Sequence, residues 1–357
     1  MSPDLRLWRG NGESGGPIER KMLTGTQEST DDNNDSFSSI VHRKAKPIVI
    51  GGVYTIFSIA VLVDGEHWHV VSGDGQGKIQ RWHIQDGKEV GVAMNAGSAV
   101  LNVAVSQDGN VIVSGTVTGR VTVWNTESHS KVTDFEAHHK WVRAVDVSPD
   151  ATKIVTGSED NTACVWSLLT GKRLLGPWKH NNNVVAAKFS PDGRLIATAT
   201  FNCATDSDSV RVYDSQNGSL LANFPVYIYS LWNQSLVWAS DSKHLFALSQ
   251  DGYIHHVDVF AKTTLSKWQI HSNDSPTCIT LAGNDTFIAA SAGSSVSFWD
   301  TTSREQIGFI ECTHTIRSMA LSSNYDLVTR GDYGVTLRAL SGALPTYYLS
   351  TVGVPIF

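Results

Sequence analysis

The chain has 357 residues, a formal net charge of −6 at pH 7, 30 glycines and 4 cysteines. An acidic balance argues against a surface built for the phosphate backbone of nucleic acids, so no nucleic-acid partner is expected. The cysteines show no C-x-x-C or metal-ligand spacing, which predicts reduced thiols in a cytoplasmic or nuclear protein.

Residues 1–42 form the first compositional segment. The stretches GNGESGG (10–16) and GTQESTDDNNDSFSS (25–39) are rich in Gly, Ser, Asn and acidic residues and have no apolar pattern. Such a composition cannot offset the entropy lost on ordering, which predicts a flexible N-terminal leader. The leader is either a bare tail or a docking segment. The first residues also lack the apolar core of a secretory signal.

The next segment, PIVIGGVYTIFSIAVLV at 47–63, carries no charge and follows the basic run HRKAK at 42–46. As a helix it would span about 26 Å, which is shorter than a hydrocarbon core of about 30 Å. The alternative is two strands separated by the glycine pair. We expect strands here and no membrane span.

Strand-ending residues then recur at a nearly constant interval. They are Trp82, Trp124, Trp166, Tyr213, Val257, Trp299 and Leu337, separated by 42, 42, 47, 44, 42 and 38 residues. A sustained period of this length is typical of propellers and solenoids, in which each unit buries its faces against copies of itself.

The internal pattern of one unit is clearest at 140–174. Four alternating apolar segments, VRAVDVS, KIVTGS, ACVWSL and KRLLGPW, are separated by the turn sequences PDAT, EDNT and LTG. This pattern predicts four short antiparallel strands, and helical periodicity is found nowhere over a useful length. The fold class is therefore all-β.

Several short motifs in phase with this repeat resemble the WD-repeat β-propellers. They are SQDG at 106–109, SPDA at 148–151, SPDG at 190–193, WN at 124–125, YD at 213–214 and WD at 299–300. The resemblance covers residues 43–357 and implies a seven-bladed propeller of four-stranded antiparallel blades.

The resemblance also implies a structural tetrad in each well-formed blade, made of a His, a Ser or Thr, an Asp and a Trp. The one complete set is His138, Ser158, Asp160 and Trp166. A connected set of this kind satisfies buried polar groups and fixes one geometry, so its expected role is structural.

Closure of the ring has two candidates. Residues 43–50 precede the first complete blade, and the tail LPTYYLSTV at 344–352 follows the last. Either segment could add the outer strand of the last blade and so remove an exposed edge. The N-terminal strand is the favoured candidate.

The sequence contains no recognisable catalytic motif. The segment most similar to such a motif is GDGQGK at 73–78, which resembles a phosphate-binding loop. It is expected between two strands, whereas a phosphate-binding loop precedes a helix. We therefore expect no enzyme activity, no cofactor and no metal site.

Docking residues are expected on the face that carries the loops preceding each inner strand, which is where partners of WD-repeat propellers commonly bind. Trp and Arg are enriched in binding hot spots. The candidates on this strand-entry face are Trp141, Arg143, Glu159, Asn183, Trp232, Gln234, Gln250 and Arg317. The alternative is that the two tryptophans pack against the neighbouring blade.

The resulting functional hypothesis is a non-catalytic scaffold that binds a protein or peptide within a multi-subunit complex. Two alternatives remain open, a reader of a histone tail or ubiquitin through the central channel and a degenerate propeller enzyme. A degenerate repeat protein without a partner is a further possibility. The sequence does not indicate the oligomeric state.

Overall fold

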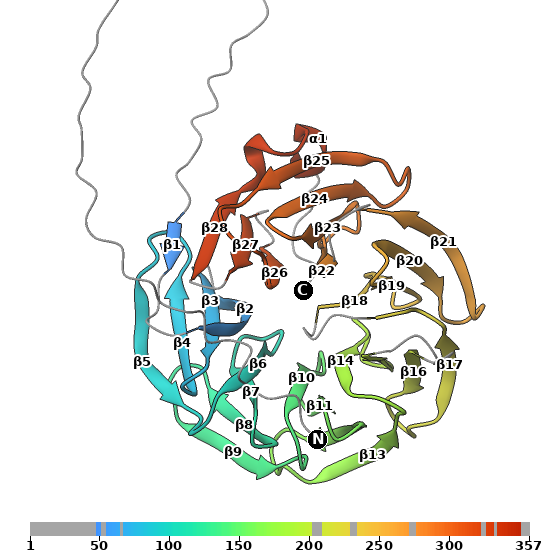
Figure 1. Ribbon diagram of the computed structural model, residues 1–357. Coiled ribbons are helices and arrows are strands. Elements are labelled where there is room, and N and C mark those ends of the chain that lie inside the picture. The colour runs from blue at the N-terminus through green and yellow to red at the C-terminus, as the bar shows by residue number, and fades with distance from the viewer. Residues whose placement is uncertain are drawn as a thin grey trace, which may run out of the picture. The chain divides into compact units, whose positions relative to one another are not determined.

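The computed structural model describes residues 48–50, 55–64, 67–201, 209–228, 234–270, 276–322, 326–331 and 334–350. These residues form seven four-stranded antiparallel sheets arranged in a ring, as the sequence analysis predicted (Figure 1). The predicted leader, residues 1–42, lies outside the described residues, so its boundary stays a prediction.

Each blade contributes four strands, which follow one another from the centre of the ring outward. The first to third blades are β2 (Ile56–Asp64), β3 (His67–Asp74), β4 (Lys78–His83), β5 (Glu89–Asn95); β6 (Val100–Val105), β7 (Val111–Thr116), β8 (Arg120–Asn125), β9 (Lys131–Glu136); β10 (Val142–Val147), β11 (Lys153–Ser158), β12 (Thr162–Ser167), β13 (Arg173–Lys179). The fourth and fifth are β14 (Val184–Phe189), β15 (Leu195–Thr200), β16 (Val210–Asp214), β17 (Leu220–Phe224); β18 (Leu236–Trp238), β19 (His244–Leu248), β20 (Tyr253–Asp258), β21 (Thr263–Gln269). The sixth and seventh are β22 (Pro276–Leu281), β23 (Phe287–Ala292), β24 (Ser295–Asp300), β25 (Gln306–Glu311); β26 (Ser318–Leu321), β27 (Asp326–Arg330), β28 (Val335–Ala339), β1 (Ile48–Ile50).

The burial pattern explains why the apolar alternation is strong in some strands and weak in others. In the third blade β11 is almost wholly buried, because neighbouring blades cover both of its faces. The outer strand β13 is mostly exposed, with two partly buried residues, because only one of its faces is covered. The predicted strands of this blade agree with the observed ones to within one residue at each end.

Close packing between the first four blades depends on a glycine in the second strand. A Cβ atom added to Gly73, Gly115 or Gly157 would lie 2.5 to 2.6 Å from a valine Cγ1 on the inner strand of the next blade. The repeat therefore needs glycine at this position, because any side chain would push the blades apart.

Strand β1 closes the ring. It pairs antiparallel with β28, with Val49 opposite Thr336, and so supplies the outermost strand of the seventh sheet. The segment at 47–63 thus contains two strands, β1 and β2, as predicted. The helices in the described part of the chain are short, and none is long and apolar enough to cross a bilayer.

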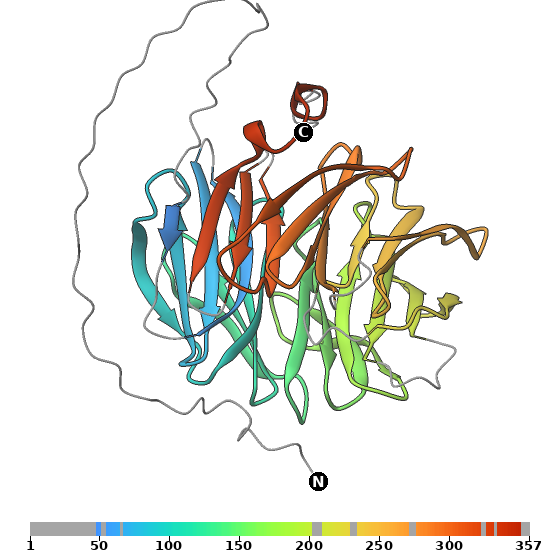
Figure 2. The ribbon, with the colours of Figure 1, turned by 45° about the horizontal axis from the view of Figure 1, so that its top comes forward.

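The C-terminal segment takes a different place from the strand considered as the alternative. The short 3-10 helix Leu340–Gly342 is followed by helix α1 (Thr346–Ser350), which lies above one end of the ring in Figure 2. Leu340 and Leu344 belong to one hydrophobic cluster with Phe287 and Phe298 of the sixth blade. Tyr348 donates a hydrogen bond to Asp300 at 2.7 Å, so this segment is fastened to the sixth blade.

Candidate binding site at the channel mouth

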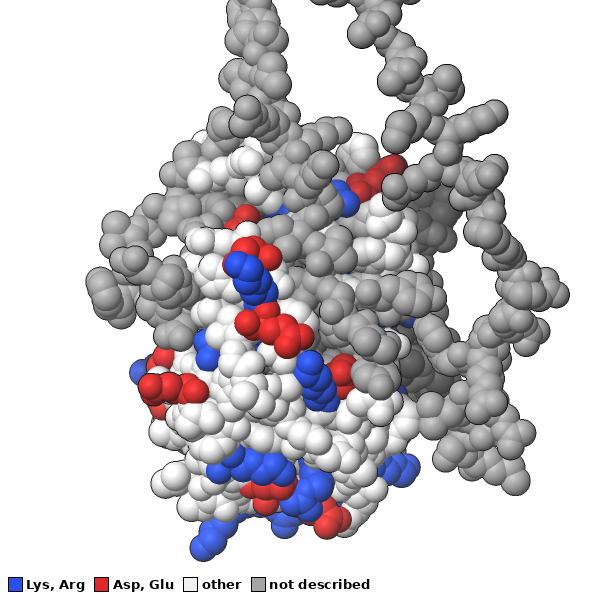
Figure 3. All heavy atoms as spheres, turned by 90° about the vertical axis from the view of Figure 1, so that its left-hand side faces the viewer, with Lys and Arg blue, Asp and Glu red and all other residues white. Residues whose placement is uncertain are grey.

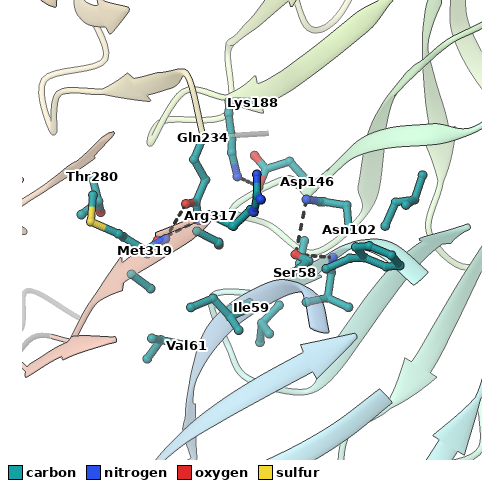
Figure 4. Close-up of a pocket in the computed structure, with 18 of the residues that line it drawn as sticks. Ser58, Ile59, Val61, Asn102, Asp146, Lys188, Gln234, Thr280, Arg317 and Met319 are labelled. Carbon is teal, nitrogen blue, oxygen red and sulfur yellow. Dashed lines mark hydrogen bonds and ion pairs between the residues drawn. The ribbon is translucent and has the colours of Figure 1, made fainter. Parts of the chain in front are cut away.

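A cavity of about 310 Å³ lies between the inner strands, and all seven blades line it. Its volume is near the lower end of the roughly 300–1,000 Å³ typical of ligand pockets. Figure 2 shows that the strands of each blade run between the same two ends of the ring. The polar lining residues are Ser58, Asn102, Arg143, Asp146, Lys188, Gln234, Thr280, Arg317 and Ser318. Figure 4 labels all of these except Arg143 and Ser318.

Five lining residues stand at the beginning of an inner strand, and they define what we call the channel mouth. They are Phe57, Leu101, Arg143, Gln234 and Arg317. Each inner strand is entered from the loop that follows the preceding blade, so these positions lie at one end of the channel. This end is the strand-entry face that the sequence analysis predicted to carry docking residues.

Trp141, Arg143 and Glu159 form one connected cluster at the mouth. The guanidinium carbon of Arg143 lies 4.7 Å from the centre of the Trp141 ring. Its Nε and Nη2 both donate to Glu159 Oε1, the Nε at 2.8 Å. The backbone N–H of Glu159 donates to the carbonyl of Trp141 at 3.0 Å, which ties the two loops together. All three residues are partly exposed, so the cluster is ordered and still accessible.

The side-chain amide of Gln234 is hydrogen-bonded within the wall of the channel. Its side-chain Nε2 donates to the carbonyl of Met319, and its Oε1 accepts from the N–H of the same residue, both at 2.7 Å. The carbonyl of Gln234 accepts from the N–H of Ile279 at 2.9 Å. Gln234 therefore joins the fifth blade to the sixth and seventh, and its amide is already satisfied.

A second set of polar residues lines the channel along the inner strands and joins consecutive blades. Ser58 accepts from the N–H of Val103 at 3.1 Å, and Asn102 accepts from the N–H of Val145 at 3.1 Å. Asp146 links the third blade to the fourth in the same way.

Asp146 makes two contacts with the fourth blade. Its Oδ2 accepts from the N–H of Phe189 at 2.9 Å, and its Oδ1 lies 3.2 Å from the ammonium of Lys188. The carboxylate is therefore neutralised within the wall and presents little free charge to the channel.

The remaining predicted docking residues have different environments. Asn183 is partly buried, and its carbonyl accepts from the N–H of Phe201 at 2.8 Å. Gln250 is partly buried, and its Oε1 makes no hydrogen bond with any described residue. Arg317 is partly buried and lines the channel. Trp232 lies outside the described residues.

The structure thus brings Arg143, Gln234 and Arg317 together at one cavity, with Trp141 and Glu159 against Arg143. The sequence analysis missed Ser58, Asn102, Asp146 and Lys188. The sequence did contain a signal for two of them. Asn102 interrupts the apolar segment VLNVAV and Asp146 interrupts VRAVDV, and the two are separated by about one repeat. Their role as links between blades required the tertiary structure.

The predicted tetrad needs one correction, because Thr156 holds the place given to Ser158. Trp166 Nε1 donates to Thr156 Oγ1 at 2.8 Å, and His138 Nε2 lies 2.7 Å from the same oxygen. Ser158 Oγ instead accepts from the N–H of Asp160 at 3.1 Å. Thr156 and Ser158 are two residues apart and share a face of the strand, but Ser158 is the last residue of β11 and lies opposite the bulge between Val142 and Ala144, where its hydroxyl contacts the turn that follows.

The equivalent hydroxyl recurs in the first two blades. Trp82 donates to Ser72 at 2.8 Å and Trp124 donates to Ser114 at 2.9 Å, each partner ten residues before the Trp. The repeat therefore positions the hydroxyl at this spacing in three consecutive blades.

The protonation of the third-blade network follows from Asp160. Burial would raise the pKa of this carboxyl, but hydrogen bonds from His138 and Thr162 outweigh burial and hold the pKa below its ordinary value. An ionised carboxylate only accepts, so His138 Nδ1 donates to Asp160 at 2.9 Å. The other ring nitrogen, Nε2, lies 2.7 Å from Thr156 Oγ1, which accepts from Trp166 Nε1 at 2.8 Å. The network is closed and buried, which fits a structural role.

The family model described as WD domain, G-beta repeat (WD40) matches residues 90–125, 129–167 and 173–214. Each match runs from the outer strand of one blade through the first three strands of the next. No curated protein matches the sequence. The chain therefore contains three consecutive WD repeats within a propeller of seven blades that share one strand order.

Proposed function

We propose that the protein is a non-catalytic scaffold that binds a peptide or protein segment at the channel mouth, as part of a larger complex in the cytoplasm or nucleus. The observation that carries this proposal is the cluster of Trp141, Arg143 and Glu159. It is partly exposed and internally ordered, and it stands beside a cavity lined by all seven blades.

A preformed site of this kind lowers the cost of binding. The Arg143 side chain is held by the Trp141 ring on one side and by the Glu159 carboxylate on another, so little rotamer freedom is lost when a partner arrives. The closed ring keeps the inner strands in place, which favours binding with little backbone movement.

Two histidines with strongly lowered pKa values lie away from the channel cavity. Burial lowers the pKa of His180 to about 3 and that of His255 to about 4. Neither residue lines the channel cavity. Within the described residues, no group of three or more His, Cys, Asp or Glu side chains could hold a metal ion.

The proposal is tested by selecting peptides from a random nonapeptide display library on the folded protein. Selected peptides should lose affinity by about thirtyfold or more when Trp141→Ala is introduced, because a buried aromatic anchor contributes about 2 kcal/mol or more. Phe260→Ala is the matched control, because Phe260 is 63% exposed and lies between β20 and β21, at the opposite end of the ring. Circular dichroism checks that both variants fold.

If the selected peptides bind wild type and Trp141→Ala equally, the mouth is not the binding surface. Loss of binding in Phe260→Ala alone would place the site on the opposite face.

A further inference from the structure

The seventh blade differs from the other six in how its third strand continues. In blades one to six the third strand runs through a short turn into the fourth strand. In the seventh blade the fourth strand is β1, which comes from the N-terminal side of the chain, so β28 is not followed by such a turn. The chain continues instead into residues 340–350, which we call the C-terminal strap.

In other blades the turn after the third strand covers the outer strand of the preceding blade. Thr133 on β9 donates a hydrogen bond to the carbonyl of Leu169, in the turn after β12, at 2.8 Å. A Cβ atom added to Gly218, in the turn after β16, would lie 3.3 Å from Trp178 Nε1 on β13. These turns therefore pack against the outer part of the interface between two blades.

The C-terminal strap makes the equivalent contact with the sixth blade. Leu340 is 1% exposed and Leu344 is 6% exposed, and both belong to the hydrophobic cluster that joins β23 and β24 of the sixth blade to β26 and β27 of the seventh. A Cβ atom added to Gly308 on β25 would collide with the carbonyl oxygen of Ala343, so glycine leaves room for the strap backbone. The strap thus takes the place of the missing turn.

A hydrogen bond between Tyr348 and Asp300 fastens the far end of the strap. The Tyr348 hydroxyl donates to Asp300 Oδ2 at 2.7 Å, and the backbone N–H groups of Thr302 and Ser303 donate to Oδ1. Burial would raise the pKa of Asp300, but the hydrogen bonds from Ser303 and Tyr348 outweigh burial and hold the pKa below its ordinary value. An ionised Asp300 attracts the hydroxyl and would repel a negative charge in its place.

The charges around Tyr348 are acidic. Burial, Asp300 and Glu305 all raise the pKa of the Tyr348 hydroxyl, to about 12. The outer surface of the ring on the face in Figure 3 is different, because basic and acidic side chains are interspersed there. A negative charge added at Tyr348 therefore meets carboxylates.

The strap differs from the turns that it resembles, because a strand of the same blade joins it at one end only. It can separate from β25 without breaking the pairing of any strand. On this basis we propose that the C-terminal strap is a second closure of the ring, which seals the interface between the sixth and seventh blades and opens when a negative charge replaces the hydroxyl contact at Asp300. This inference is independent of the proposed binding at the channel mouth.

Hydrogen exchange of the full chain, followed by mass spectrometry, tests the strap. Leu344→Ala shortens a leucine that packs in the interface, and Tyr348→Glu removes the hydroxyl and places a negative charge near Asp300. In both variants the amides of β27 and β28 should exchange faster by about tenfold or more, because local exchange follows the free energy of local opening. The amides of β11 and β12, in the third blade, should keep their wild-type rates.

Three further variants make the result specific. Tyr347→Glu places the same charge on a neighbouring residue that is 66% exposed, and Leu220→Ala shortens a leucine on β17 that is 53% exposed. Both should leave the exchange of β27 and β28 unchanged. Tyr348→Phe removes only the hydroxyl and should speed this exchange by about threefold, because one hydrogen bond is lost. This mild variant provides the measurement if Tyr348→Glu does not fold.

Wild-type exchange of β27 and β28 in Leu344→Ala would show that the strap does not close the interface. An equal increase in the third blade would mean that the strap contributes to global stability and does not open locally. Equal effects of Tyr347→Glu and Tyr348→Glu would overturn the role given to the contact with Asp300.

Discussion

The third and fourth blades occupy equivalent places in the ring but satisfy their buried histidines differently. His138, before the third blade, has Asp160 on one ring nitrogen and Thr156 on the other. His180, before the fourth, is 7% exposed, and neither of its ring nitrogens makes a hydrogen bond with a described residue.

Aromatic packing takes the place of the polar network in the fourth blade. Tyr213 replaces the Trp and stacks on Trp178 with ring centres 4.2 Å apart and nearly parallel planes. His180 meets the edge of Tyr213 at 6.3 Å. In the third blade Trp166 packs against Phe135 and still donates to Thr156. The same blade geometry is therefore compatible with a hydrogen-bonded network around the histidine or with aromatic packing against it. The two arrangements should contribute differently to the stability of the fold.

The largest effect is expected from Asp160→Ala. This change removes the carboxylate that accepts from the ring of His138 and from the N–H of His139, so the buried Nδ1–H of His138 loses its charged partner. The unfolding free energy should fall by about 3 kcal/mol. Urea denaturation followed by tryptophan fluorescence measures the shift of the midpoint. A loss below about 1 kcal/mol would mean that the network contributes no more than ordinary surface contacts.

Thr156→Val should be the next most damaging change. It preserves the shape but removes the oxygen shared by His138 and Trp166, for a loss of about 2 kcal/mol. The matched variant is Thr198→Val in the fourth blade, where the one hydrogen bond of the hydroxyl to a described residue is long, 3.5 Å to the Arg211 carbonyl. Thr198→Val should lose well under half as much. Equal losses would contradict the difference drawn between the two blades.

The fourth blade should instead be sensitive to acid. Burial lowers the pKa of His180 to about 3, and the charge of Arg211 adds to the effect. The unfolded chain takes up a proton near the ordinary pKa of 6.5, whereas the folded chain resists it until about pH 3. The unfolding free energy therefore falls as pH drops below about 6.5, by at most about 2 kcal/mol at about pH 5 from this residue.

The variant His180→Phe tests this coupling. The variant should restore the unfolding free energy that His180 costs at about pH 5, at most about 2 kcal/mol. Above about pH 7 it should change the pH dependence little. His256, whose pKa burial lowers to about 4, stays in the variant, so some acid sensitivity persists. Denaturation midpoints on either side of the ordinary histidine pKa, at about pH 5 and about pH 7.5, give the measurement. An unchanged difference between the two pH values would show that His180 is not the source.

The smallest effect is expected for Ser158→Ala. Its hydroxyl accepts from the N–H of Asp160 and donates only weakly to the Lys140 carbonyl at 3.4 Å. The loss should be about 0.5 kcal/mol, well below that of Thr156→Val. If Ser158→Ala proved the more destabilising of the two, the assignment of Thr156 as the hydroxyl of the network would be wrong.

Particular residues show how far the sequence alone could lead. The spacing of Trp82, Trp124 and Trp166 predicted the repeat, and the strands of the third blade were predicted almost to the residue. The same reasoning assigned Ser158 to the tetrad, whereas the structure has Thr156 there, two residues earlier on the same strand. Spacing could not separate them, because the choice depends on how the strand twists and pairs next to a bulge.

The sequence by itself determined the all-β class, the blade count and the strand order, because alternation and turn chemistry act over a few residues and repeat along the chain. Only the tertiary structure decided which residues meet across blades. The pairing of Asp146 with Lys188 and of Gln234 with Met319 joins positions 42 and 85 residues apart. Such contacts depend on the stagger between neighbouring sheets, which is set by packing around the ring and has no local pattern in the chain.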